Sequence, residues 1–147
     1  MGKETTANQW TRHHTLYEKA AFNEVGSPAH RWRGNVTMII TLPNWAHWRV
    51  HDKVPPLKTA PSEELAVRAL AFCLSNYRER PSKIQGFAGV RDEMFRIAQE
   101  ETLENEIGRE ALNLCNFFTS QLNVMLQVPI LRHNYNLPAK DTLPIAE

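Results

Sequence analysis

The stretch SEELAVRALAFCLSNYR, residues 62–78, carries the strongest packing signal in this chain. Between Leu65 and Leu74 its only strongly polar side chain is that of Arg68. A helix on the surface of a domain shows one apolar stripe, whereas a helix that is apolar on nearly every side is enclosed by its neighbours. The pattern therefore predicts a buried central helix over about residues 62–78, around which the other elements pack.

The chain has 147 residues, of which 42% are hydrophobic, and this is enough for one domain with a single core. No stretch approaches the ~20 apolar residues that a membrane span needs. The N-terminal residues lack the apolar segment of a signal peptide, so we expect no membrane association and a cytoplasmic location. Cys73 and Cys115 lie in apolar helical stretches, which favours reduced core thiols over a disulfide.

Two alternating runs predict a β-hairpin. Apolar and polar residues alternate from Val36 to Leu42 and again from Ala46 to Val50, which is the period of a strand. Pro43-Asn44 between the runs suits a tight turn, so we expect a two-stranded antiparallel hairpin over about residues 35–52.

The remaining apolar spacings of three and four predict helices over residues 6–24, 82–90, 91–104 and 109–127. The expected fold is thus α+β and mostly helical, with four to five helices around the central one. Residues 1–128 would form a single globular domain, and the Pro-containing residues 129–147 an extended tail.

The net charge of +1 conceals an uneven distribution. Residues 1–58 contain eight Lys and Arg against four acidic residues, together with five of the six histidines. Residues 92–110 contain seven acidic residues against two Arg. A basic region favours phosphates or an acidic partner, and an acidic helix favours solvent or a basic partner. The two regions could also attract each other within the fold.

The basic third predicts a nucleic-acid surface. Cations neutralise phosphates, and exposed aromatic rings stack on unpaired bases. The alternative is that the tryptophans complete the core while the charges are ordinary solvated side chains. The candidate nucleic-acid-binding residues are Arg31, Trp32, Arg33, Trp45, His47, Arg49, His51 and Lys53.

Three other kinds of site fit the sequence less well. His47 and His51 would share one face of a helix, as in zinc sites, but in a strand they would lie roughly 13 Å apart, so we expect no metal site and no cofactor. A helix-turn-helix with its turn at Gly89 would present Asp92 and Glu93 to phosphate, which disfavours it. No Gly-rich phosphate loop or nucleophile motif is visible, so we expect no catalytic residues.

The tail and the acidic region favour a protein partner or a homo-oligomer. The apolar anchors of the tail would be Leu131, Tyr135, Leu137 and Leu143. Together these features predict a non-catalytic accessory protein in a replication, regulation or mobile-element setting. Its basic half would contact nucleic acid, and its acidic helix and tail would bind the partner. The alternative is a pure protein–protein interaction module, such as an adaptor, inhibitor or assembly subunit.

Overall fold

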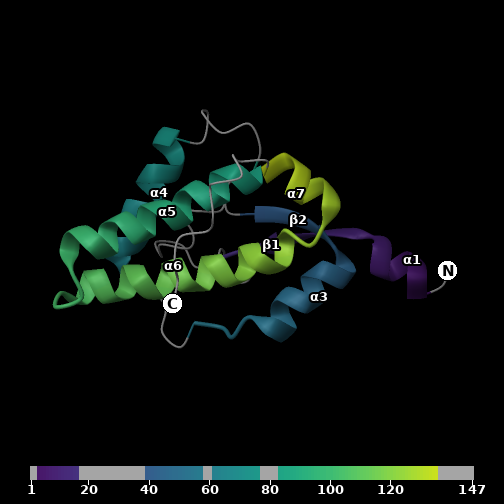
Figure 1. Ribbon diagram of the computed structural model, residues 1–147, viewed down its shortest axis with the longest axis horizontal. Coiled ribbons are helices and arrows are strands. Elements are labelled where there is room, and N and C mark those ends of the chain that lie inside the picture. Colours follow the sequence, from purple (N-terminus) through teal and green to yellow (C-terminus); the bar gives the residue numbers. More distant parts are fainter. Residues whose placement is uncertain (1–2, 17–38, 58–60, 77–82, 136–147) are drawn as a thin grey trace.

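The fold is α+β and mostly helical, as the sequence predicts, with one two-stranded antiparallel sheet (Figure 1). A computed structural model describes residues 3–16, 39–57, 61–76 and 83–135. The elements are α1 (Lys3–Asn8), β1 (Trp10–His14), β2 (Ile39–Pro43), α3 (Asn44–Lys53), α4 (Glu63–Asn76), α5 (Lys83–Glu101), α6 (Glu106–Met125) and α7 (Pro129–Tyr135).

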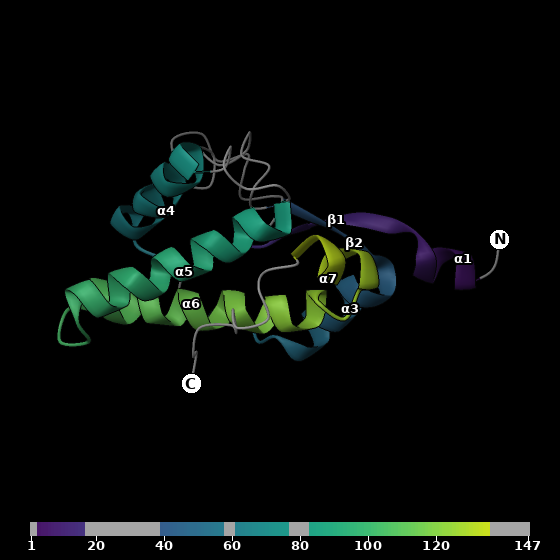
Figure 2. The same ribbon diagram turned by 45° about the horizontal axis from the view of Figure 1, so that its top comes forward.

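The long helices α5 and α6 lie side by side and form the centre of the molecule (Figures 1 and 2). Phe87 of α5 and Phe118 of α6 are both fully buried, with ring centroids 5.1 Å apart. Because the two apolar stripes face each other along the whole length of the helices, this pair supplies most of the core.

Helix α4 is not the centre that the sequence analysis expected. It lies against α5 on the side away from α3 (Figure 2). Leu65, Ala66 and Ala69 are buried, whereas Val67 is 38% exposed and Ala71 is also exposed. Among the side chains of α4 that the structure describes, the buried ones therefore form one stripe, and the helix is not enclosed on every side.

The sheet is confirmed as two-stranded and antiparallel, but its strands differ from those predicted. Strand β2 pairs with β1, with Trp10 opposite Pro43 and His14 opposite Ile39. The predicted second strand is instead helix α3, and the predicted helix over residues 6–24 contains β1. Alternation over a run as short as 46–50 fits either structure, because Ala46 and Val50 also lie one helical turn apart.

Helix α3 begins where β2 ends. Pro43 has an extended backbone at the N-cap of α3, so the Pro-Asn pair starts a helix rather than closing a hairpin. Ala46 and Val50 are buried beneath this helix, while Trp48 is 53% exposed. The helix packs on β1, β2 and α6 (Figure 1).

The two predicted helices at 82–90 and 91–104 form the single helix α5, so Gly89 lies within a helix and not in a turn. This arrangement excludes a helix-turn-helix at that position. Residues 129–135, expected to be extended, form α7, which packs on α5. Among the described helices, none combines the length and apolarity needed to cross a bilayer.

Candidate metal centre

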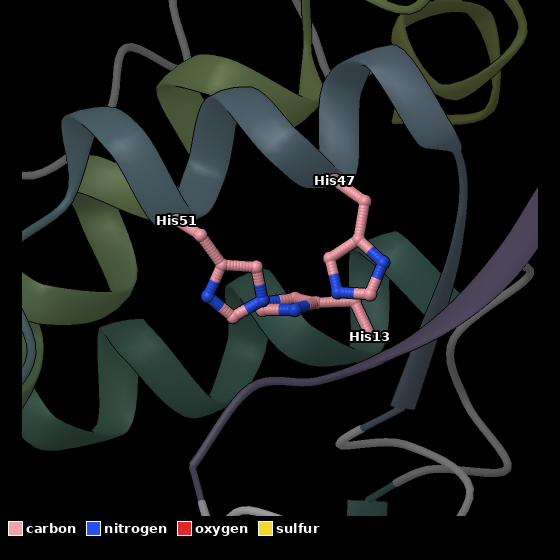
Figure 3. Close-up of side chains that lie close together, drawn as sticks. All are labelled: His13, His47 and His51. Atoms are coloured by element: carbon pink, nitrogen blue, oxygen red, sulfur yellow. The ribbon is translucent and has the colours of Figure 1, made fainter. Parts of the chain in front are cut away.

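Three imidazoles meet where β1 faces α3. His13 extends from β1, and His47 and His51 project from the same face of α3 because residues four apart in a helix lie one above the other (Figure 3). The strand–helix junction at Pro43 and Asn44 folds α3 back over the sheet, and this brings the three side chains together although 38 positions separate His13 from His51.

The cluster is compact. The ring centroids of His13 and His47 are 4.9 Å apart, those of His13 and His51 5.4 Å, and those of His47 and His51 4.8 Å. One ring nitrogen from each histidine lies within 4.8 Å of the other two. His13 is 4% exposed, His47 is half-buried and His51 is exposed, so the cluster has a closed inner side and an open outer side.

The innermost histidine has one ring nitrogen engaged and one free. His13 Nε2 lies 2.6 Å from Gln121 Oε1, and Gln121 Nε2 donates to the Thr15 carbonyl oxygen at 2.9 Å. His13 Nδ1 is buried and has no hydrogen-bond partner. A buried polar atom without a partner costs on the order of 1–3 kcal/mol, so its place in a cluster of three imidazoles requires an explanation.

His47 is oriented by a separate chain of hydrogen bonds. Its Nδ1 lies 2.9 Å from Thr11 Oγ1, which donates to Asn44 Oδ1 at 2.8 Å. Asn44 Nδ2 in turn donates to the Thr6 carbonyl oxygen at 2.6 Å. This chain ties the first turn of α3 to β1 and α1, and it fixes the His47 ring relative to His13.

The environment keeps the inner imidazoles uncharged. Burial lowers the pKa of His13 to about 4, against a smaller opposite effect of the Gln121 hydrogen bond and with further lowering by the charges of His47, His51 and His14. Burial also lowers the pKa of His47, followed by the charges of His51 and His14. Metal binding requires neutral imidazole, and these shifts favour that form at neutral pH.

The geometry fits a transition-metal ion. Zinc binds imidazole nitrogen at about 2.0–2.1 Å, which places the nitrogens of a tetrahedral site roughly 3.4 Å apart. The three nitrogens lie within 4.8 Å of one another, so they would have to approach one another to coordinate one ion. A metal site was rejected from the sequence because His47 and His51 were assigned to a strand. That reason was wrong, because both residues lie on α3.

Several residues of the site were not expected from the sequence. His13, Thr11 and Gln121 come from distant segments that only the fold brings together. The one available signal was the spacing of His47 and His51, which suits a zinc site on a helix.

Five of the eight predicted nucleic-acid-binding residues lie on helix α3. Trp45 is partly buried against the core, and the Arg49 guanidinium lies 5.3 Å from its ring centroid and donates to Gln127 Oε1. His47 and His51 belong to the three-histidine cluster, and Lys53 is exposed. The predicted residues Arg31, Trp32 and Arg33 lie outside the described residues. Nucleic-acid contact by this set stays a prediction.

Of the four predicted partner-binding anchors, two lie in the described part of the chain and two lie outside it. Leu131 packs against the hydrophobic core, and Tyr135 is buried with its hydroxyl 3.5 Å from Arg91 Nη2. Within the fold these two side chains stabilise the packing of α7 on α5. Leu137 and Leu143 lie outside the described residues.

A groove of about 710 Å³ lies elsewhere, between residues 54–57 with Pro61 and one side of α6. Its lining contains prolines, Asn116 and Phe117 but no histidine. The groove also carries the charged side chains of Glu106, Arg109 and Glu110, whereas the potential metal ligands of the described residues gather at the three-histidine cluster.

Comparison with known proteins adds no assignment, since no protein-family model, no curated protein and no solved structure matches this chain.

Proposed function

We propose that this protein is a metal-dependent hydrolase that cleaves phosphodiester bonds in nucleic acid. His13, His47 and His51 would bind one zinc-class ion. The observation that carries the proposal is the buried, unpartnered Nδ1 of His13 beside two further imidazoles. A metal ion bound there would give this nitrogen the partner that it lacks.

The ligand chemistry favours one class of ion. Imidazole suits Zn²⁺, Ni²⁺ and Co²⁺, whereas Mg²⁺ and Ca²⁺ prefer oxygen ligands. Three protein ligands leave one position of a tetrahedral site for water or substrate, which is the pattern of catalytic rather than structural zinc sites. The open side at His51 gives a substrate access to that position.

Held by these three histidines, an ion of this class would supply Lewis-acid chemistry toward a phosphate ester. The described residues of the cluster include no carboxylate, so the positive charge of the ion stays available to an anionic substrate. Uncharged protein ligands therefore favour a phosphate ester over a neutral substrate.

His14 is the candidate general base. The charge of its imidazole lowers the pKa of both His13 and His47, although His14 lies on the face of β1 opposite His13. Imidazole is the most common general base in enzymes. In the proposed reaction His14 accepts a proton from the attacking water. The water oxygen would bond to phosphorus as the ester P–O bond breaks, the departing oxygen would take up a proton from solvent, and His14 would return its proton to solvent.

The surroundings favour a nucleic-acid substrate. The site lies within residues 1–58, the region with an excess of four positive charges. Arg12 and Lys53 are exposed there, and their cations would neutralise backbone phosphates. Trp48, next to His47 on α3, is 53% exposed and offers a ring on which a base can stack.

Cleavage of supercoiled plasmid DNA and of a labelled single strand tests the proposal. We expect activity with Zn²⁺, Ni²⁺ or Co²⁺ and its loss on addition of EDTA. His14→Ala should lower the cleavage rate by about 10²–10⁴-fold while metal binding is retained, because only the proton acceptor is removed. His47→Ala should abolish both metal binding and cleavage.

His133→Ala is the matched control, because His133 is an exposed histidine on α7 and does not belong to the cluster. Its metal binding and cleavage should equal those of the wild type. Metal-loaded wild-type protein that cleaves neither substrate would refute the proposed activity. Full activity of His14→Ala would refute the role of His14.

A further inference from the structure

The side-chain amide of Gln121 has only one orientation that satisfies its neighbours. A backbone carbonyl oxygen accepts hydrogen bonds and cannot donate them, so the group 2.9 Å from the Thr15 oxygen must be the NH₂ of Gln121. The amide oxygen Oε1 then faces His13 Nε2 at 2.6 Å. Gln121 Oε1 therefore requires a hydrogen-bond donor from the imidazole of His13.

An amide oxygen can be satisfied only by a donor, so the proton of neutral His13 lies on Nε2. Its Nδ1 then holds a lone pair and no proton. This is the atom that is buried without a partner, in a side chain that is only 4% exposed. The other tautomer would place two lone pairs against each other and would bury an unpaired N–H.

A different series of hydrogen bonds sets the tautomer of His47. The Thr6 carbonyl oxygen fixes Nδ2 of Asn44 as the donor, so Asn44 Oδ1 accepts from the Thr11 hydroxyl. That hydroxyl has used its proton and accepts from His47 Nδ1, 2.9 Å away. Neutral His47 therefore carries its proton on Nδ1 and its lone pair on Nε2.

We infer that Gln121 and Thr11 are positioning residues that preset the tautomers of the metal ligands. The ion is bound through Nδ1 of His13 and Nε2 of His47. This assignment rests on the metal site proposed above and deepens it by naming the ligand atoms and the groups that select them. Hydrogen bonds behind ligand histidines fix the ring orientation and raise the basicity of the ligand nitrogen.

Two parts of the molecule, strand β1 and helix α6, meet at His13. Gln121 belongs to α6 and lies 108 positions from His13 in the sequence. The strand and helix that carry the three histidines therefore depend on the α5–α6 pair for the correct protonation of the innermost ligand. On this account the helical pair is part of the site and not only a support for it.

The direct test is ¹H–¹⁵N NMR of the histidine rings in metal-free wild-type protein near pH 7. We expect a protonated Nε2 on His13 and a protonated Nδ1 on His47. A proton on Nδ1 of His13 would overturn the inference. This result does not depend on metal binding or cleavage, so it stands even if the proposed function fails.

Two substitutions of similar size separate positioning from packing. Gln121→Met removes the acceptor and should weaken metal binding by about 10–100-fold and mix the two tautomers of His13. Gln121→Glu keeps an acceptor and should keep the Nε2-protonated tautomer and the metal. A Gln121→Met protein with the wild-type tautomer and affinity would contradict the assignment.

If Gln121→Met does not fold, Thr11→Val supplies the equivalent test at His47. This substitution preserves the shape of the side chain and removes the oxygen that accepts from Nδ1. It should mix the tautomers of His47 and weaken metal binding, with Thr11→Ser as the conservative variant that restores both. Wild-type tautomer and affinity in Thr11→Val would contradict the inference.

Discussion

At the scale of single residues, His13 combines burial with an unpartnered polar atom, and this combination destabilises the folded state. It is almost fully buried, it is surrounded by other imidazoles, and one of its nitrogens has no partner in the metal-free fold. Burial alone explains why the ring is neutral, since a low-polarity environment disfavours the charged form. It does not explain why a histidine is there, and the proposed metal binding would.

Protonation of His13 should destabilise the metal-free protein. Burial lowers its pKa from 6.5 to about 4, so between these values the unfolded chain binds a proton that the folded chain does not. The free energy of unfolding should therefore be highest above pH 6.5 and fall by about 3 kcal/mol as the pH drops to 4. The lowered pKa of His47 acts in the same direction.

Urea unfolding of the metal-free protein at a series of pH values measures this effect, with His13→Gln as the comparison. The variant lacks the titrating group and should lose less stability over the same range. Parallel pH profiles of wild type and variant would show that His13 does not carry the effect.

At the scale of elements, the turn between α5 and α6 determines how the two long helices meet. Thr102 has a positive φ of 66°, and Asn105 caps α6 by accepting from the Ile107 amide. A Cβ at Gly108 would overlap the Thr102 carbonyl oxygen, so only glycine fits at this point of α6. Gly108 lies within α6, where the lack of a side chain lets the turn pass close to the helix.

Gly108→Ala should therefore lower the free energy of unfolding by about 1–3 kcal/mol, because the turn must shift to admit the methyl group. Ser120→Ala, at an exposed position of the same helix, is the control and should change stability by less than about 0.5 kcal/mol. Urea unfolding measures both. A Gly108→Ala protein as stable as the wild type would show that the close contact is not a constraint.

Local pattern predicted α4, α5 (as two helices) and α6, but not the elements of the site. The apolar stripe of α6 was recognised, because a period sustained over twenty residues fits only a helix. The five residues of β1 and the ten of α3 are too short for periodicity to decide, and both were assigned to the wrong structure. Since the spacing of His47 and His51 has chemical meaning only on a helix, one misassigned element concealed the site.

At the scale of the whole molecule, the site is a product of tertiary structure. Its ligands come from β1 and α3, and the groups behind them from β1, α3 and α6. The basic character of residues 1–58 was visible in the sequence, and it is consistent with the proposed nucleic-acid substrate. The convergence of Gln121 on His13 was not predictable, because no local pattern connects residues 108 positions apart.

His13, His47 and His51 are proposed to bind one metal ion, and X-ray absorption of the purified protein loaded with one equivalent of Zn²⁺ measures that coordination. We expect three imidazole nitrogens and one oxygen or further light ligand at about 2.0–2.1 Å, with no sulfur. His51→Ala should lose one imidazole, and His133→Ala should leave the spectrum unchanged. Failure to retain a stoichiometric ion, or a coordination sphere without three imidazoles, would contradict the account.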